Sequence, residues 1–402
     1  ESSEDVDTKY TYLSELAWHV HQEGKSGLDQ EELSHFTRQH VERFHLNRNA
    51  SELQKEVVES RILQPRYGRY SFVYKHFLYY FVARYMRDNW EEAGVQSCVD
   101  AAVVDIHRED YANILIFLTY LTKNKAVIRK ILQRTRGLFD HVEPCDLKEH
   151  LAFVGSVQDS LPARILPDED PKKHRRAWLQ QRDLEGLDDN PAPENEPNEK
   201  DLAEVLSINR AIKSLQVLGQ ITRNFSGSLR QDLKLQIVRE CFDLALRVLN
   251  SINDLLERNL NSTLEGLADL FGKNFSEMPE RQRLSAARKL VFIIIEQMCV
   301  ATLRRISHAV GSEALEPTYA ELEKTYDNRA TRFVQLSIRL DHFQSFPQSR
   351  ILDLKEEVED DIFSMDLLRY LVYEHFYLFR RPREVAQSMC EKLSIHYGKT
   401  IR

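Results

Sequence analysis

The chain has 402 residues, a net charge of −8 and a pI near 6.0, with 42% hydrophobic residues and only 13 Gly and 12 Pro. This composition indicates a globular, mainly helical protein of two or three folded units. The acidic balance argues against a dedicated nucleic-acid-binding protein. The longest apolar run, Leu290–Ile295, is too short to cross a bilayer, so we expect a soluble, cytoplasmic protein with no membrane partner.

The cysteines and the first residues of the chain indicate its redox environment and whether it is a fragment. The cysteines are Cys98, Cys145, Cys241, Cys299 and Cys390. Their odd number and wide spacing predict reduced thiols rather than a disulfide framework or a zinc site. The chain has no signal peptide and starts without methionine, so we expect a fragment or a processed product.

Three amphipathic helices are predicted at the start of the chain. The first covers residues 10–23, and the second covers residues 29–44. Asp29 and Glu32 have the spacing of a capping box at the start of the second helix. The third helix covers residues 49–62.

A turn and an aromatic helix follow. The sequence QPRYGR (64–69) supplies turn residues between two short stretches with a β pattern, Arg61–Leu63 and Tyr70–Tyr74. Three helices followed by such a hairpin are the order of a winged-helix domain. Aromatic residues then recur every three or four positions, which predicts a helix over Lys75–Asn89. Its predicted buried stripe consists of Phe77, Phe81 and Tyr85, with Leu78 and Val82 beside it.

Helical periodicity continues over residues 110–140, and the composition then changes. Residues 166–201 are acidic and proline-containing, with few large apolar side chains. Such a stretch lacks the apolar surface that would offset the entropy of ordering its backbone, so we predict a solvated linker.

The C-terminal half has long helical patterns and no strong strand signal. Predicted helices cover residues 202–225, 229–260, 262–271, 279–310, 317–343, 353–380 and 383–397. The predicted fold class is mainly α: a winged-helix-like domain with a small β-wing, followed by helical-bundle or helical-repeat-like domains. The predicted domains are 1–90, ending in the aromatic helix; 91–165, helical; 166–201, the acidic linker; and 202–402, all-helical.

Two segments imitate nucleotide-binding motifs. Leu393–Thr400, LSIHYGKT, has leucine where a phosphate-binding loop requires its first glycine, so we interpret it as a frayed C-terminal tail. Val291–Glu296, VFIIIE, resembles a strand that ends in a magnesium-binding acid, but its flanks have a helical period. We predict a buried helical segment there, with Glu296 facing solvent or paired with Arg304 or Arg305.

Histidines and acids lack the spacing of a chemical site. His19 and His21 point to different faces of a helix, and His35 and His40 are five positions apart. Acid pairs such as Glu356–Glu357 are typical of solvated helix faces. We therefore predict no catalytic, cofactor-binding or metal-binding residue in this chain, and no enzymatic activity of its own.

The third predicted helix argues against DNA recognition, because a groove-reading helix is basic. Its charged residues are Glu52, Glu56, Glu59, Lys55 and Arg61. The net charge is negative, so we expect the winged helix to pack against a neighbouring domain instead.

The order of these elements resembles the region that follows the ATPase core in STAND-class NTPases, signal-transducing ATPases related to NACHT and NB-ARC proteins. The residues that carry the likeness are 60–63, the hairpin and YSFVYKHFLYYFVARYMRDN (70–89). Bacterial members have a comparable aromatic run, and His76 stands where NACHT relatives often have a histidine before phenylalanine. Residues 111–123 are similar to the helical segment after that winged helix, so the resemblance covers about residues 10–140.

This resemblance implies the non-catalytic C-terminal regulatory or sensor portion of a bacterial, NACHT-like STAND NTPase, with a role in anti-phage defence. ATP and Mg²⁺ would bind in an NTPase domain whose Walker motifs this sequence lacks. The implied partners are that upstream domain, a phage or host protein as the trigger, and further copies of the chain in a homo-oligomer. Some bacterial relatives carry an N-terminal effector such as a calcineurin-like phosphoesterase.

Two other functions stay open. One is a transcription regulator that joins a winged helix to a helical ligand-binding or dimerisation domain, and the other is a helical scaffold. The coding sequence upstream of Glu1 distinguishes these two functions from the STAND hypothesis. A P-loop ATPase encoded there supports the STAND hypothesis, and a start codon at that point contradicts it.

Overall fold

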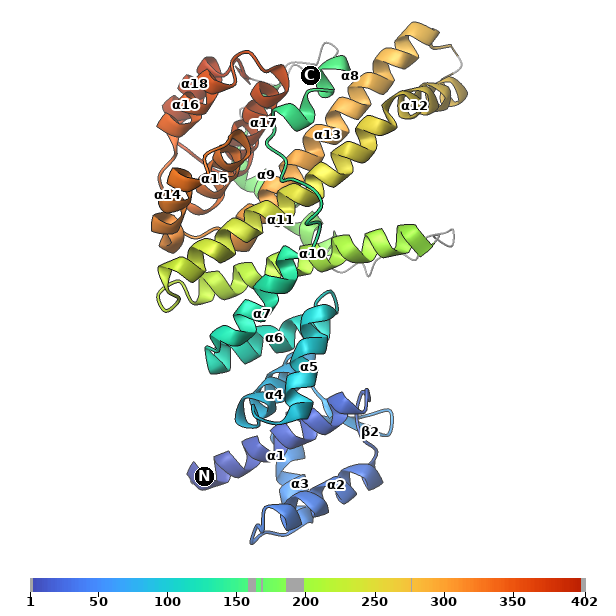
Figure 1. Cartoon of the computed structure of the whole chain (residues 1–402), viewed down its shortest axis with the longest axis vertical. Coiled ribbons are helices and arrows are strands. Elements are labelled where there is room, and N and C mark those ends of the chain that lie inside the picture. Colours follow the sequence, from blue (N-terminus) through green and yellow to red (C-terminus); the bar gives the residue numbers. More distant parts are fainter. Residues whose placement is uncertain (1–2, 158–163, 168, 186–198, 276, 399–402) are drawn as a thin grey trace. The chain divides into compact units, whose positions relative to one another are not determined.

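The computed structural model describes residues 3–157, 164–167, 169–185, 199–275 and 277–398. In these residues the protein is mainly α-helical, as predicted, with two small two-stranded sheets (Figure 1). The chain divides into two compact units, residues 1–134 and 135–402. No helix in the described ranges combines the length and the apolar character that a membrane span requires.

Unit 1 contains a helical start, a β-hairpin and a second helical part. Its elements are α1 (Ser3–Gln22), α2 (Gln30–Arg43), α3 (Ala50–Glu59), β1 (Leu63–Arg66), β2 (Arg69–Phe72), α4 (Lys75–Asp88), α5 (Ala93–Val104), α6 (Glu109–Thr122) and most of α7 (Lys125–Arg136). The predicted capping box is confirmed, because Asp29 accepts a hydrogen bond from the Glu32 N–H and the Glu32 carboxylate accepts one from the Asp29 N–H, both at 2.9 Å. Asn49 caps α3 in a similar way through the Ser51 N–H.

The aromatic helix α4 lies between α1 and α6 and packs against both. Phe81 is 2% exposed and contacts the rings of Tyr10 and Phe72, with centroid distances of 5.8 and 6.1 Å. Tyr85 stacks on Trp18 of α1 at 4.8 Å. Phe77 is 37% exposed, so its predicted burial is wrong. It lies in the first turn of α4, next to Tyr74, which is 63% exposed.

Unit 2 is built on long helices. Its helices are α8 (Val154–Val157), α9 (Pro171–Glu185), α10 (Glu199–Asn224), α11 (Gln231–Arg258), α12 (Leu260–Asn274), α13 (Glu280–Val310), α14 (Glu316–Thr325), α15 (Arg329–His342), α16 (Gln348–Glu357), α17 (Ile362–Leu378) and α18 (Arg383–Lys392). Two short 3-10 helices cover Glu149–Leu151 and Glu313–Leu315. The strands β3 (Ile165–Pro167) and β4 (His396–Gly398) pair in parallel.

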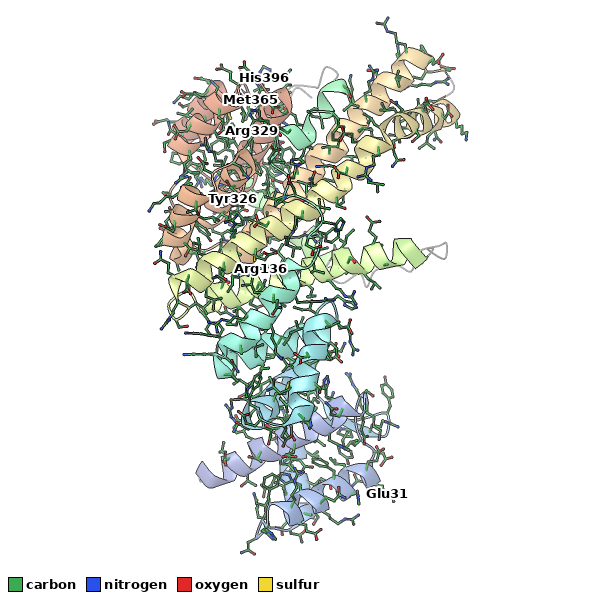
Figure 2. All side chains as sticks on the ribbon, in the orientation of Figure 1. Glu31, Arg136, Tyr326, Arg329, Met365 and His396 are labelled. Carbon is green, nitrogen blue, oxygen red and sulfur yellow. The ribbon has the colours of Figure 1, made fainter. Side chains whose placement is uncertain are left out.

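The core of unit 2 lies around α13. α10, α11 and α12 pack on α13, and α15 and α17 pack on it as well. Figure 2 labels Tyr326, Arg329 and Met365 in the part of this unit that contains α14 to α18. The last two residues of α7 belong to unit 2. Of these, Arg136 donates to Gln236 at 3.2 Å and lies 3.7 Å from the Glu240 carboxylate.

Several predicted helices are divided in the structure. The predicted helix over 110–140 is interrupted at Lys123, which has a left-handed φ of 51°. Asn328 and Asp361 are the N-caps of α15 and α17, so the predicted helices 317–343 and 353–380 each form two shorter ones. Side-chain oxygens of the two caps accept backbone N–H groups of the first turn, which starts a new helix where the apolar period alone continues.

The division into units differs from the predicted domains. It falls between residues 134 and 135, rather than at 90, 165 and 201, because α5 packs on α6 and α6 packs on α4. Within the predicted linker, residues 171–185 form α9, so the linker prediction is wrong there. α9 packs on α17, with His174 stacked on Tyr377 at 4.0 Å. Residues 186–198 of the predicted linker lie outside the described residues.

Two details near the C-terminus also correct the sequence analysis. The predicted helix 383–397 ends at Lys392, and His396–Gly398 form β4 instead of a frayed tail. The pairing partner, β3, comes from residues 165–167, so no local pattern in either segment predicts the pair. Lys399 and Thr400 lie outside the described residues.

Phe81→Ala tests the packing of α4. Removing a buried Phe side chain typically costs about 3–5 kcal/mol, so we expect the free energy of unfolding of unit 1 to fall by about that amount. Hydrogen exchange followed by mass spectrometry reports each unit separately, and we expect faster exchange over residues 3–134 with little change over 199–398.

Phe77→Ala is the matched control on the same helix, since Phe77 is partly exposed. We expect it to change exchange in unit 1 only slightly. Equal effects of the two substitutions would contradict the assignment of Phe81 to the core.

Candidate functional site

The hairpin of unit 1 is extended by a third segment of chain. β1 and β2 pair antiparallel, from Leu63–Phe72 at one end to Arg66–Arg69 at the other. Leu28, between α1 and α2, pairs with Tyr70 through two backbone hydrogen bonds of 3.0 and 2.7 Å. A Cβ on Gly27 would lie 2.4 Å from the Tyr70 carbonyl oxygen, so this close approach requires glycine.

The tip of the hairpin presents an aromatic ring between two arginines. Tyr67 and Gly68 form the two-residue turn with φ angles of 51° and 77°, the geometry of a type I′ hairpin turn. The side chain of Tyr67 is fully exposed, and Arg66 and Arg69 beside it are exposed as well. Non-glycine residues rarely adopt a positive φ, so the turn holds Tyr67 away from the core at a conformational cost.

The surface of α3 is acidic, and two of its three acids, Glu56 and Glu59, form ion pairs. Glu56 accepts a hydrogen bond from Arg48 at 2.6 Å and lies 3.4 Å from the Lys9 ammonium. Glu59 lies 3.8 Å from the Lys55 ammonium. These pairs neutralise part of the negative charge without making the helix basic, so α3 lacks the excess of cations that phosphate binding requires.

The histidines singled out in the sequence lie in separate surroundings. His19 lies 3.5 Å from Glu23, whereas His21 lies 3.6 Å from the Cys98 sulfur. His35 is exposed, and His40 is buried against Tyr12, where burial lowers its pKa to about 4. His76 is exposed in the first turn of α4. The described residues contain no group of three or more His, Cys, Asp or Glu side chains placed to hold a metal ion.

The segment that carries this hairpin has known relatives. Residues 27–82 match the model of the family described as Novel STAND NTPase 4. Over this segment the chain is related to the STAND-class NTPases. No curated protein and no solved structure matches the chain.

The match follows structural boundaries. It begins at Gly27–Leu28, where the third segment joins the hairpin, includes α2, α3, β1 and β2, and ends in the middle of α4. The hairpin is thus matched together with the segment that completes its sheet and with the first half of the helix that supports it. The matched segment, residues 27–82, contains no Walker motif.

A buried acid cluster in unit 2 was not found from the sequence. Glu296 is buried on α13 and forms an ion pair with Arg164, so the prediction that it faces solvent or pairs with Arg304 or Arg305 is wrong. Arg164 also donates to Asp366 of α17 at 2.8 Å and lies over the ring of Tyr370. The two partners lie 132 and 202 positions from Arg164 along the chain, so no local spacing announces the cluster.

Charge in this cluster is not balanced, because one guanidinium faces two carboxyl groups. Burial raises the pKa of Glu296 to about 7, and Arg164 opposes that rise. Arg164 adjoins β3, so the cluster joins this strand to α13 and α17. The arrangement can hold a proton near neutral pH.

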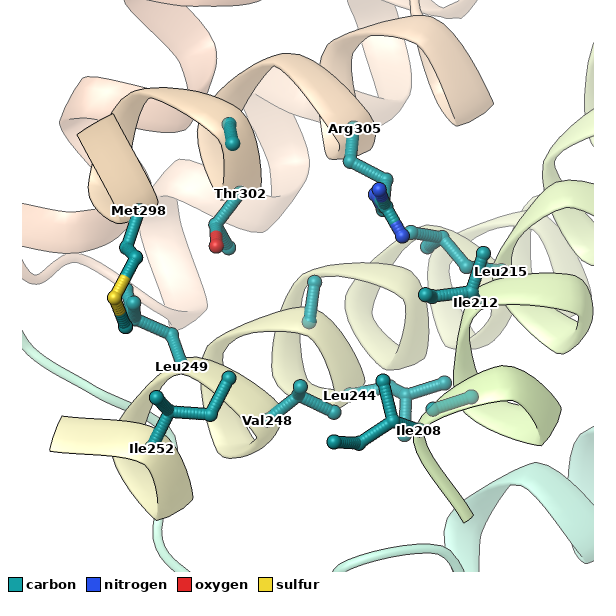
Figure 3. Close-up of a pocket in the computed structure, with 13 residues that line it drawn as sticks. Ile208, Ile212, Leu215, Leu244, Val248, Leu249, Ile252, Met298, Thr302 and Arg305 are labelled. Carbon is teal, nitrogen blue, oxygen red and sulfur yellow. The ribbon is translucent and has the colours of Figure 1, made fainter. Parts of the chain in front are cut away.

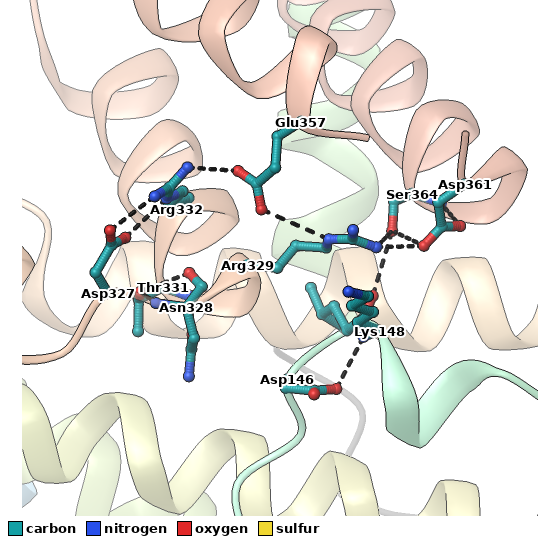
Figure 4. Close-up of polar contacts among 11 residues, drawn as sticks. Asp146, Lys148, Asp327, Asn328, Arg329, Thr331, Arg332, Glu357, Asp361 and Ser364 are labelled. Atoms are coloured by element: carbon teal, nitrogen blue, oxygen red, sulfur yellow. Dashed lines mark hydrogen bonds and ion pairs between the residues drawn. The ribbon is translucent and has the colours of Figure 1, made fainter. Parts of the chain in front are cut away.

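A second polar network is structural (Figure 4). Arg329 donates to Asp361 and, at 3.2 Å, to the Ser364 hydroxyl. Ser364 in turn donates to the carbonyl oxygen of Leu147 at 3.2 Å. Arg332 donates to Asp327 and Glu357 at 2.7 and 2.6 Å. The network thereby joins α15, the start of α17 and the segment before α8, and it leaves no carboxylate free for chemistry.

All five cysteines are free and buried. Burial raises the pKa of the thiols of Cys98 and Cys390 to about 11 and that of Cys145 to about 12. These thiols stay protonated at neutral pH, which agrees with the predicted reduced cysteines and argues against a reactive one.

Glu296→Gln tests the acid cluster. The pKa of Glu296 is higher in the folded protein, about 7, than its usual value of 4.5, so the folded state binds the proton more tightly. Its contribution to stability is complete below pH 4.5 and is lost as the pH rises to about 7. We therefore expect the free energy of unfolding of the variant minus that of the unmodified chain to increase by about 1–3 kcal/mol between pH 4.5 and 7.5.

Urea denaturation at each pH measures this difference. The difference is used because other buried groups also change the free energy of unfolding over this pH range. His40 and His375 have pKa values lowered to about 4 and 3, so their contribution to stability increases as the pH rises, opposite to that of Glu296. Glu265→Gln, at an exposed position on α12, is the matched control. A pH-independent difference for Glu296→Gln would contradict the raised pKa.

Proposed function

We propose that this chain is the non-catalytic regulatory and sensor portion of a bacterial, NACHT-like STAND signal-transducing ATPase. The family match over residues 27–82 is the observation that carries the proposal. In it, ATP and Mg²⁺ bind to an NTPase domain encoded with the chain, and the chain acts by packing on that domain. A role in anti-phage defence in the cytoplasm, a phage or host protein as trigger and a homo-oligomeric active state complete the proposal.

The order of elements in unit 1 supports a winged helix for the matched part. Three helices precede the hairpin, and Leu28, between the first two, pairs with the second hairpin strand. This order, with Leu28 bridged to the two-stranded hairpin, agrees with the arrangement expected of a winged-helix domain. The aromatic helix α4 then packs against α1 and leaves the hairpin tip projecting. Arg66, Tyr67 and Arg69 at that tip are the residues we assign to contact with the NTPase domain.

A purified chain is expected to bind no ATP–Mg²⁺ in isothermal titration calorimetry. Micromolar affinity for the nucleotide would contradict the non-catalytic assignment.

The coding sequence upstream of Glu1 is expected to encode a P-loop ATPase domain. Purified separately, that domain is expected to bind this chain. Tyr67→Ser is expected to raise the dissociation constant of the complex about tenfold or more, because aromatic side chains at the centre of an interface supply much of its binding energy. Tyr120→Ser, an exposed tyrosine outside the matched segment, is the control.

The alternative is a winged-helix transcription regulator, and the exposed arginines of the hairpin tip favour it. Binding to double-stranded DNA that weakens steeply with salt and is lost in Arg66→Ala/Arg69→Ala would support this function. We expect no such binding, because α3, the helix before the hairpin, is acidic, whereas a groove-reading helix is basic.

A further inference from the structure

Unit 2 contains an apolar cavity between α10, α11 and α13 (Figure 3). Its volume is about 260 Å³. Ile208 and Ile212 of α10, Val248 and Ile252 of α11, and Met298 of α13 project into it. Ala301 and Arg305 on its lining are exposed, so the cavity opens to solvent, and an apolar hollow open to solvent marks a candidate binding site.

Small side chains account for the space. Each of the three helices places an alanine on the lining: Ala211 on α10, Ala245 on α11 and Ala301 on α13. A Leu or Phe at any of these positions would fill part of the cavity. The hollow therefore follows from residue choice on all three helices and not from a single irregularity.

One end of the cavity carries a cation. Figure 3 shows the Arg305 side chain extending from α13 toward Ile212 and Leu215 of α10. In the described part of the chain no carboxylate pairs with Arg305, whereas its neighbour Arg304 forms an ion pair with Glu374. Arg305 reaches solvent at the edge of the cavity, and partial desolvation by the side chains beside it lowers its pKa. A guanidinium on the edge of an apolar surface attracts an anion that brings its own apolar body.

We infer that this cavity binds a single-chain aliphatic carboxylate, with the alkyl chain among the apolar side chains and the carboxylate on Arg305. Apart from Thr302 and Arg305 the lining offers no polar side chain, which excludes sugars and nucleotides. The volume lies just below the roughly 300–1,000 Å³ of typical ligand pockets, so a chain of medium length fits. This inference stands independently of the proposed function.

Calorimetric titration of the full chain with hexanoate, octanoate and decanoate, all below their micelle-forming concentrations, tests the inference. We expect saturable binding at one site, with affinity rising about fourfold for each added methylene until the cavity is filled. Arg305→Gln is expected to weaken octanoate binding about tenfold or more, because it removes a charge-assisted hydrogen bond. Octyltrimethylammonium, which has the same chain and the opposite charge, is expected to bind far more weakly.

Two further variants locate the ligand. Ala301→Phe fills the cavity from an exposed position on α13 and is expected to abolish binding, while Ala286→Phe on the same helix, outside the cavity, leaves it unchanged. Arg281→Gln is the matched control for Arg305→Gln, since both arginines are exposed on α13. Thermal unfolding of each variant confirms that it is folded.

Several outcomes overturn the inference. They are the absence of saturable binding by any of the carboxylates, equal binding of octyltrimethylammonium, and octanoate affinity that neither Arg305→Gln nor Ala301→Phe changes. A cavity that serves only to receive an apolar side chain of a partner protein would bind none of the series.

Discussion

The contact of α10 with α13 is the constraint on which the architecture of unit 2 depends. A Cβ on Gly219 of α10 would lie 2.3 Å from the carbonyl oxygen of Ala309, so the two backbones touch at a point where only glycine fits. Glycine in a helix interior costs about 1 kcal/mol relative to alanine, and the close packing offsets this cost. The apolar cavity lies nearer the N-terminal end of α10, on the alanine-lined side of α11 and α13. The α10–α13 backbone contact at Gly219 and the alanines near the N-terminal half of α10 thus determine where the three helices touch and where they leave a cavity.

Buried charges specify how the remaining elements of unit 2 attach to this core. Arg164 joins β3 to α13 and α17, and Arg329 joins α15 to the start of α17. Replacing such buried pairs by apolar residues is often neutral for stability, whereas removing a single partner is costly. Their contribution is therefore to make one arrangement of the helices much better than its alternatives. The unbalanced pair of carboxyl groups at Arg164 adds a sensitivity to pH that a fully paired network lacks.

In unit 1, aromatic packing rather than buried ion pairs holds the elements together, and it supports the hairpin. α4 buries Phe81 and Tyr85 against α1, and the hairpin that precedes it is anchored by Leu28 through backbone hydrogen bonds. Anchoring leaves the tip free to present Tyr67. The family match covers this anchored hairpin and half of its supporting helix, which agrees with a role for the module as one piece.

Local signals in the sequence determined the first elements of unit 1, as far as α4, and the long helices of unit 2. The capping box of Asp29 and Glu32, the cap at Asn49 and the aromatic period after Phe77 each act within a few residues, so the sequence alone predicted α2, α3 and α4. α9 was missed because its stability comes from contact with α17, and β3 and β4 were missed because each is completed by a strand far away in the sequence. The ion pair of Glu296 and the alanine-lined cavity likewise depend on residues from separate helices, and only the tertiary structure brings them together.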